Sequence, residues 1–290
     1  RLGYSVAEIA EIITYVQGTS SLKKAPFINE ESLRIKGFSE ADLMLLAEPD
    51  RGDHVLAAVL LWAMQHHTDI VVLGKASPRL LDGIDNLQHI WHRWRPQRYG
   101  LVDIRVDNAI EPMPIGPERL AIFAFSGGVD GTFSLFRHFY GRVGRNNRKP
   151  GAALLIQGMD IPLNRDDFYQ NAAERAERML TGTGVPLIRM QTNSRMLGQN
   201  WEDSFGLQLS ACFLVLQQHY SFAIHGSGEP YDNFLMPWGS TPLTDPLCST
   251  EVMQHELDGC AFDRTEKVEW IGKNTEVAPY LRVCWAGKNL

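Results

Sequence analysis

Ser126, Gly127, Gly128 and Asp130 lie together in the stretch "AIFAFSGGVDGTFSLF", between an apolar run and a segment with helical periodicity. Glycines let a backbone approach a ligand closely, and the first turn of a helix offers unpartnered N–H groups and a positive dipole end. The Ser126 hydroxyl adds a donor. Asp130 would oppose a bare anion but fits one that carries Mg²⁺. The residues therefore indicate a phosphate loop, although glycine pairs also form ordinary strand-to-helix turns.

The segments around this loop alternate between short apolar strands and helices. Strand-like segments at 120–125, 152–158, 186–193 and 221–228 are separated by helical ones. This alternation predicts an α/β fold with a doubly wound parallel sheet, whose ligands bind beyond the carboxyl ends of the strands. "SGGVDG" stands at such an end. It has neither the Gly-x-Gly-x-x-Gly spacing of dinucleotide-binding folds nor the Gly-Lys-Ser/Thr ending of a Walker loop.

The part of the chain before this alternation reads as mainly helical. Helices are expected within residues 5–18 and from Asp53 to His67, with Asp53 as the N-cap candidate of the second. Another is expected after Ser77 and Pro78, which stand in the favoured cap and first-turn positions, and short strands at 69–74 and 101–107. "EPMPIGPE", residues 111–118, holds three prolines and a glycine and is the best boundary candidate. We therefore expect an N-terminal helical accessory region over residues 1–117 and a nucleotide-binding domain over residues 118–290.

Composition limits the classes of protein to which the chain can belong. Its 44% hydrophobic and 21% charged residues are typical of soluble globular proteins, and the longest apolar run, residues 55–64, is half of what crosses a bilayer. A net charge of −6 argues against general affinity for nucleic acid. The basic cluster within residues 137–149 is either a solvated loop or a phosphate contact. Four widely spaced cysteines without a signal peptide indicate a cytoplasmic protein with free thiols.

The loop "FSGGVDGT" resembles the Ser-Gly-Gly-x-Asp-Ser loop of the PP-loop ATP pyrophosphatases, the adenine nucleotide alpha hydrolase-like superfamily. That resemblance implies a HUP-type fold, ATP and Mg²⁺ as cofactors, and adenylation of a carboxylate or amide oxygen with release of pyrophosphate. On it, Ser126, Asp130 and Thr132 are the catalytic candidates, Gly127, Gly128 and Gly131 join the ATP loop, and Asp130 holds Mg²⁺. Gly131 stands where the family usually has serine. Thr132 then either supplies the missing hydroxyl or marks weakened catalysis.

The C-terminal half is similar to one branch of that superfamily. "HGSGEPYDN", the segment from "PLTDPLCS" to "EKVEWI", and "LRVCW" resemble the 7-cyano-7-deazaguanine synthase-like proteins, some of which occur in antiphage defence systems. The branch implies a deazapurine-type carboxylate substrate and a Cys-x-x-Cys zinc knuckle just after "RVCW". Cys284 would be one Zn²⁺ ligand only if a knuckle follows Leu290. We expect the protein sequence to continue past one or both ends of this chain.

Other polar residues follow the remaining strands. Gly158, Met159 and Asp160 are expected beside the adenosine, with a turn or capping role as the alternative for Asp160. Gln191 and Asn193 are candidates for polar contacts, whereas helix capping also explains Glu202 and Asp203. The candidates for substrate binding are His225, Ser227, Glu229, Tyr231, Asp232, Arg264 and Lys267. Their alternatives are a core histidine, ordinary turn residues and a surface salt bridge.

These observations favour an AMP-forming ligase that passes an activated carbon to a nitrogen nucleophile. The first alternative is a tRNA or small-molecule thiolation enzyme, which needs reactive cysteines; Cys212 reads as structural, whereas Cys248 and Cys260 stay open. A second alternative is an ATP-binding interaction module without turnover. The expected partners are a small carboxylate, a protein or tRNA acceptor, and either further copies of the chain or a partner protein, with no membrane.

Overall fold

The structure is a computed structural model of the 290-residue chain, and it describes residues 51–109 and 119–282. One compact unit covers Arg51–Leu290. The helix expected within residues 5–18, the proline-rich stretch at 111–118 and Cys284 lie outside the described residues. The domain boundary expected between residues 117 and 118 falls within this unit, so residues on both sides of it contribute to one body.

A five-stranded sheet forms the centre of the unit, and all of its neighbouring strands are parallel. Its order is β5-β4-β3-β6-β7, so the chain first runs outward from β3 and then returns to β3's other side. The four predicted strands are confirmed, whereas β7, a largely polar edge strand, was not predicted. The strands are β3 (Leu120–Ala124), β4 (Lys149–Gln157), β5 (Leu187–Gln191), β6 (Phe222–Gly226) and β7 (Gln254–Asp258).

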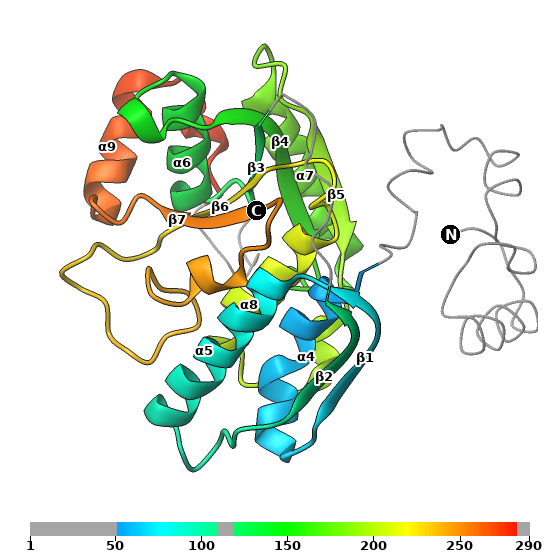
Figure 1. The fold of residues 1–290 in the computed structure, drawn as a ribbon. Coiled ribbons are helices and arrows are strands. Elements are labelled where there is room, and N and C mark those ends of the chain that lie inside the picture. The colour runs from blue at the N-terminus through cyan, green and yellow to red at the C-terminus, as the bar shows by residue number, and fades with distance from the viewer. Residues whose placement is uncertain (1–50, 110–118, 283–290) are drawn as a thin grey trace, which may run out of the picture. The chain divides into compact units, whose positions relative to one another are not determined.

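Helices cover both faces of this sheet, as predicted for a doubly wound α/β fold (Figure 1). Phe123 of β3 packs with α6 (Val129–Phe139), α7 (Asp166–Leu180) and α9 (Arg264–Asn274) in one core. Ile122, the next residue of β3, joins the other core with α8 (Trp201–Leu214). Successive side chains of a strand point to opposite faces, so a continuous apolar strand is buried on both sides.

Residues 51–109 add a second layer around α8. They form α4 (Asp53–His66), β1 (Ile70–Ala76), α5 (Pro78–Trp94) and β2 (Ile104–Ala109), and β1 pairs with β2 as a separate parallel sheet. Their core includes Leu207, Ala211 and Leu214 of α8. Because α8 lies between two cores, every residue from Gly206 to Leu214 is buried. This layer fixes the helix that lines the candidate site described below.

Two sequence signals in this layer have different outcomes. Ser77 caps α5, since its Oγ accepts a hydrogen bond from the Leu80 N–H at 3.0 Å, as predicted. The expectation that Asp53 caps the preceding helix is wrong, because Asp53 is the first residue of α4 and Gly52 is the cap. The Asp53 carboxylate instead accepts from Ser77 N and Gln217 Nε2. Within residues 51–109 and 119–282, the helices are too short or too polar to cross a membrane.

Candidate functional site

The glycine loop lies at the point where the strand order reverses. It follows β3, which pairs with β4 on one side and with β6 on the other. Open α/β sheets bind ligands in the crevice at such a point. Gly127 adopts φ +75°, a conformation that glycine tolerates best. Gly128 is the N-cap of α6, and no side chain of the described residues caps that helix. The first-turn N–H groups of α6 are therefore free to meet an anion.

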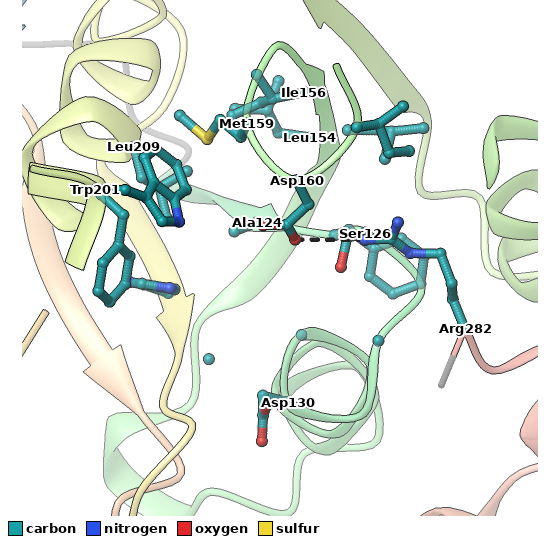
Figure 2. Close-up of a pocket in the computed structure, with 18 residues that line it drawn as sticks. Ala124, Ser126, Asp130, Leu154, Ile156, Met159, Asp160, Trp201, Leu209 and Arg282 are labelled. Carbon is teal, nitrogen blue, oxygen red and sulfur yellow. Dashed lines mark hydrogen bonds and ion pairs between the residues drawn. The ribbon is translucent and has the colours of Figure 1, made fainter. Parts of the chain in front are cut away.

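A cavity of about 260 Å³ opens beside this loop (Figure 2). Ser126, Gly128, Asp130 and Gly131 form its polar floor. The opposite wall is apolar and comes from β4, the loop after it, and α8: Leu154, Ile156, Met159, Trp201, Phe205 and Leu209. A pocket with one apolar wall and a few converging polar groups suits a ligand that has a flat apolar part and a charged part.

Gly131 makes the first turn of α6 fit against the sheet. A Cβ added at Gly131 would lie 2.5 Å from the carbonyl oxygen of Ala124 in β3. A Cβ added at Gly226, at the end of β6, would lie 2.6 Å from the Asp130 carbonyl oxygen and 2.8 Å from Gly131 N. Both neighbours are backbone and cannot swing away. The departure from serine at this position therefore has a packing reason: only a residue without a side chain fits between α6 and the two strands.

Asp130 holds two cationic side chains of α9. Its Oδ2 accepts from Arg264 Nη2 at 3.0 Å, and its Oδ1 accepts from Lys267 Nζ at 3.2 Å. Lys267 is fully buried and also donates to the Ser227 carbonyl oxygen. In Figure 2 the Asp130 carboxylate points away from Ser126 and Asp160. The structure thus brings together three residues that the sequence analysis assigned to different partners, namely Mg²⁺ for Asp130 and substrate for the two cations.

The turn after β4 supplies three residues to the cavity and one to packing. Met159, Asp160 and Ile161 line the cavity. Gly158 has φ +99°, and a Cβ there would collide with the Thr192 carbonyl oxygen, so it shapes the turn. Gln191 donates to Gln157 Oε1 at 2.7 Å. Asp203 is buried between Arg95 and Arg98, so both candidates anchor neighbouring segments.

The residues after β6 divide into an inner and an outer group. His225 lines the cavity, whereas Ser227 is buried behind it and its Oγ donates to the Glu229 carbonyl oxygen at 2.6 Å. Tyr231 is 66% exposed and Asp232 is exposed too, and both lie outside the cavity lining. Thr132 is also outside that lining and fully buried within α6. His225 and Gly226 are therefore the members of the "HGSGEPYDN" group that line the cavity, and His225 is the one with a titratable side chain.

Several residues of the site were not found from the sequence. Arg282 lines the cavity: its backbone N–H donates to the Gly127 carbonyl oxygen at 2.7 Å, and its Nη2 lies 3.4 Å from Asp160 Oδ2 (Figure 2). Trp201 and Phe205 were hidden in an apolar helix that reads as ordinary core. The position of Arg282 two residues before Cys284, in the segment "LRVCW", was the one available signal.

The described cysteines lie away from this cavity. Burial raises the pKa of the Cys212 and Cys248 thiols to about 12, and it also raises the pKa of Cys260. None of the three lines the cavity. Among residues 51–109 and 119–282, histidine, cysteine and acidic side chains form no group of three that could hold a metal ion. Cys212, Cys248 and Cys260 therefore do not supply a thiolate nucleophile to this cavity.

Fold and site together define a parallel α/β protein with an uncapped glycine loop at the switch point of its sheet. Comparison of the chain with family models, with curated proteins and with solved structures finds no match.

Proposed function

We propose that this chain is an AMP-forming ligase of the PP-loop class, with a HUP-type fold, which binds ATP at the loop after β3. The observation that carries the proposal is the uncapped first turn of α6 opening onto the cavity, with Gly127 and Gly128 bringing the backbone close. The proposed phosphate contacts are these N–H groups, the Ser126 hydroxyl and the Arg282 guanidinium. The adenine base would lie against Met159, Trp201 and Leu209.

The residues fit a polyphosphate better than they fit a metal ion at Asp130. ATP normally carries Mg²⁺, which binds through phosphate oxygens, water and one or two carboxylates. Asp130 would be the carboxylate closest to the loop, but its two oxygens already face Arg264 and Lys267. Asp130 is therefore not proposed as a ligand of Mg²⁺. Its part in the proposal is to hold α9, and with it Arg264, against the loop.

Catalysis would consist mainly of positioning and charge compensation. The α6 N–H groups and Arg282 would stabilise the charge that develops on the departing pyrophosphate, and a carboxylate substrate would lie between the α-phosphate and His225. A deazapurine-type carboxylate, with a protein or tRNA as a further candidate acceptor, is the substrate class that the resemblance to 7-cyano-7-deazaguanine synthase-like proteins suggests. A role in antiviral defence and a cytoplasmic location belong to the same proposal.

One alternative keeps the site but removes the chemistry. A protein that binds ATP without turnover would use the same loop, and Thr132, buried and outside the cavity lining, offers no hydroxyl in place of the serine absent at position 131. Thiolation is less favoured, because the described cysteines are buried away from the site and their pKa values are raised.

ATP binding to the full chain, measured by calorimetry with and without EDTA, tests the site. Arg282→Ala should weaken ATP binding by about tenfold or more, since a charge-assisted hydrogen bond to phosphate contributes about 1.5–3 kcal/mol. Arg178→Ala, an exposed arginine on α7, is the matched control and should bind as the wild type does. Equal affinity in both variants would contradict the proposed phosphate position. Formation of AMP from ATP with candidate carboxylates by the wild-type chain separates the ligase from the module.

A further inference from the structure

A buried polar network stands behind one wall of the cavity. His225 Nδ1 lies 3.1 Å from Ser240 Oγ and 3.4 Å from Asp245 Oδ2. Ser240 Oγ donates to the same Asp245 oxygen at 2.6 Å. Both partners are at least 94% buried and lie in the connection from β6 to β7, which the sequence analysis left without a function. The chain thus places a carboxylate and a hydroxyl on the same ring nitrogen of a histidine that lines the cavity.

The hydrogen bonds decide which ring nitrogen carries the proton. An ionised carboxylate only accepts, so the single hydroxyl proton of Ser240 is used in its bond to Asp245. Ser240 Oγ can then meet His225 Nδ1 only as an acceptor, so Nδ1 carries a proton. In the neutral imidazole the lone pair is therefore on Nε2. No residue of the described ranges makes a hydrogen bond to Nε2, on the ring edge opposite the network.

The same hydrogen bonds exclude a catalytic triad of Ser240, His225 and Asp245. In a catalytic triad the histidine takes the proton of the serine on one nitrogen and the carboxylate orients the other nitrogen. Here both groups meet Nδ1, and the Ser240 proton goes to Asp245. Ser240 is also buried. It is therefore a positioning residue, not a nucleophile, and the reactive position of the network is His225 Nε2.

We propose that His225 is the acid–base residue of this cavity, positioned by Asp245 and Ser240. The inference rests on the proposed ligase for the identity of the reacting molecules. As the amine nitrogen of the nucleophile forms its bond to the activated carbon, its proton passes to His225 Nε2. The carbon–oxygen bond to AMP then breaks, and AMP leaves with the electron pair. The imidazolium, now protonated on both nitrogens, is stabilised through Nδ1–H by Ser240 and the Asp245 carboxylate.

Other charged groups around the ring set the conditions for a test. His255 and Glu256 of β7 lie with His225 and Asp245 around a small void behind the ring. Across the cavity stand Asp130, Asp160 and Arg282, whereas Phe205 and Leu209 of α8 bring no charge. Asp245 is the charged group within 3.4 Å of the ring, so its removal should change the position of the ring proton more than any other single change.

Diethyl pyrocarbonate tests this assignment in the full chain without ATP, because it acylates the unprotonated nitrogen of accessible imidazoles. Peptide mass spectrometry gives the rate of modification of each histidine. His225 should react at least tenfold faster than the buried His255. In Asp245→Ala the Ser240 hydroxyl is free to donate to His225 Nδ1, which moves the proton of the neutral ring to Nε2, so the rate at His225 should fall. In Ser240→Ala the rate should fall less, because the carboxylate can still accept from Nδ1–H.

Outcomes of this experiment separate the two proposals. A His225 that reacts no faster than His255, or whose rate is the same in the wild type and in a folded Asp245→Ala variant, would overturn the acid–base assignment. Nitrogen-15 NMR of labelled histidines gives a second readout, in which the proton of neutral His225 must be on Nδ1. A His225 that behaves as expected but is not protected by ATP would overturn the ATP site and leave the acid–base assignment standing.

Discussion

Replacing Gly131 by alanine isolates the packing role of the glycine that stands where the PP-loop motif it resembles has serine. The added methyl group would lie 2.5 Å from the Ala124 carbonyl oxygen, well inside the contact distance of carbon and oxygen. The opposing atom belongs to the backbone of β3 in the centre of the sheet, and α6 is held from the other side by Gly226. The strain must therefore be relieved by moving the first turn of α6.

The size of the effect follows from two opposing terms. Alanine gains up to about 1 kcal/mol over glycine inside a helix. Overpacking a well-packed interior costs about 1–3 kcal/mol, and a backbone neighbour places this site at the upper end. We expect Gly131→Ala to lower the free energy of unfolding by about 1–2 kcal/mol, which is roughly 2–8 °C in Tm for a unit of this size. Gly131→Ser should lower it by at least as much.

Gly272 of α9 offers a matched control, because a Cβ added there would have no atom within 4 Å. Gly272→Ala should be neutral or stabilising by up to about 1 kcal/mol. Urea unfolding followed by circular dichroism measures both variants, and calorimetry with ATP follows the loop. Equal stability of Gly131→Ala and Gly272→Ala would refute the packing explanation, and the absent serine would then need a functional reason.

Three further predictions concern buried titratable groups. Burial lowers the pKa of His255 to about 4, so the stability that depends on its neutral form is complete above about pH 6.5. About 3 kcal/mol of it is lost as the pH falls toward 4. His255→Gln should make the free energy of unfolding less dependent on pH over that range, as measured by urea unfolding at several pH values. Cys212 and Cys248, whose pKa values are raised to about 12, should react with Ellman's reagent orders of magnitude more slowly in the folded protein than in urea, and fast native labelling of either would revive the thiolation alternative. Lys267→Met should lower the free energy of unfolding by about 1–3 kcal/mol, because Asp130 and the Ser227 carbonyl oxygen lose a buried donor. Lys273 is exposed on the same helix, so Lys273→Met should stay within about 0.5 kcal/mol of the wild type in the same assay.

Much of the fold could be predicted from local sequence patterns. Four of the five strands of the central sheet and the helix that begins after Ser77 follow from apolar runs and capping residues that lie within a few positions of one another. The glycine loop was placed between its strand and its helix for the same reason. The edge strand β7 was not predicted because it lacks a continuous apolar run. It has one partner strand and one buried side chain.

The site itself was decided by contacts between distant parts of the chain. Asp130 meets Lys267 across 137 positions, and Arg282 reaches Asp160 across 122. No periodicity links such residues, so the sequence could nominate them one by one but could not pair them. The same holds for His225, whose ring proton is positioned by Ser240 and Asp245. These two residues reach His225 only when the connection from β6 to β7 folds back against the end of β6.

The sequence by itself determined that this protein has a strand, a glycine loop and a helix in the order that makes an anion site, because hydrophobic period and glycine placement are local properties. The tertiary structure decided what surrounds that site. In the folded chain Asp130 pairs with one arginine and one lysine, Arg264 and Lys267. Gly131 is required because the backbones of α6, β3 and β6 approach one another there. Backbone proximity between elements is a property of their packing, and it has no counterpart in the order of residues along the chain.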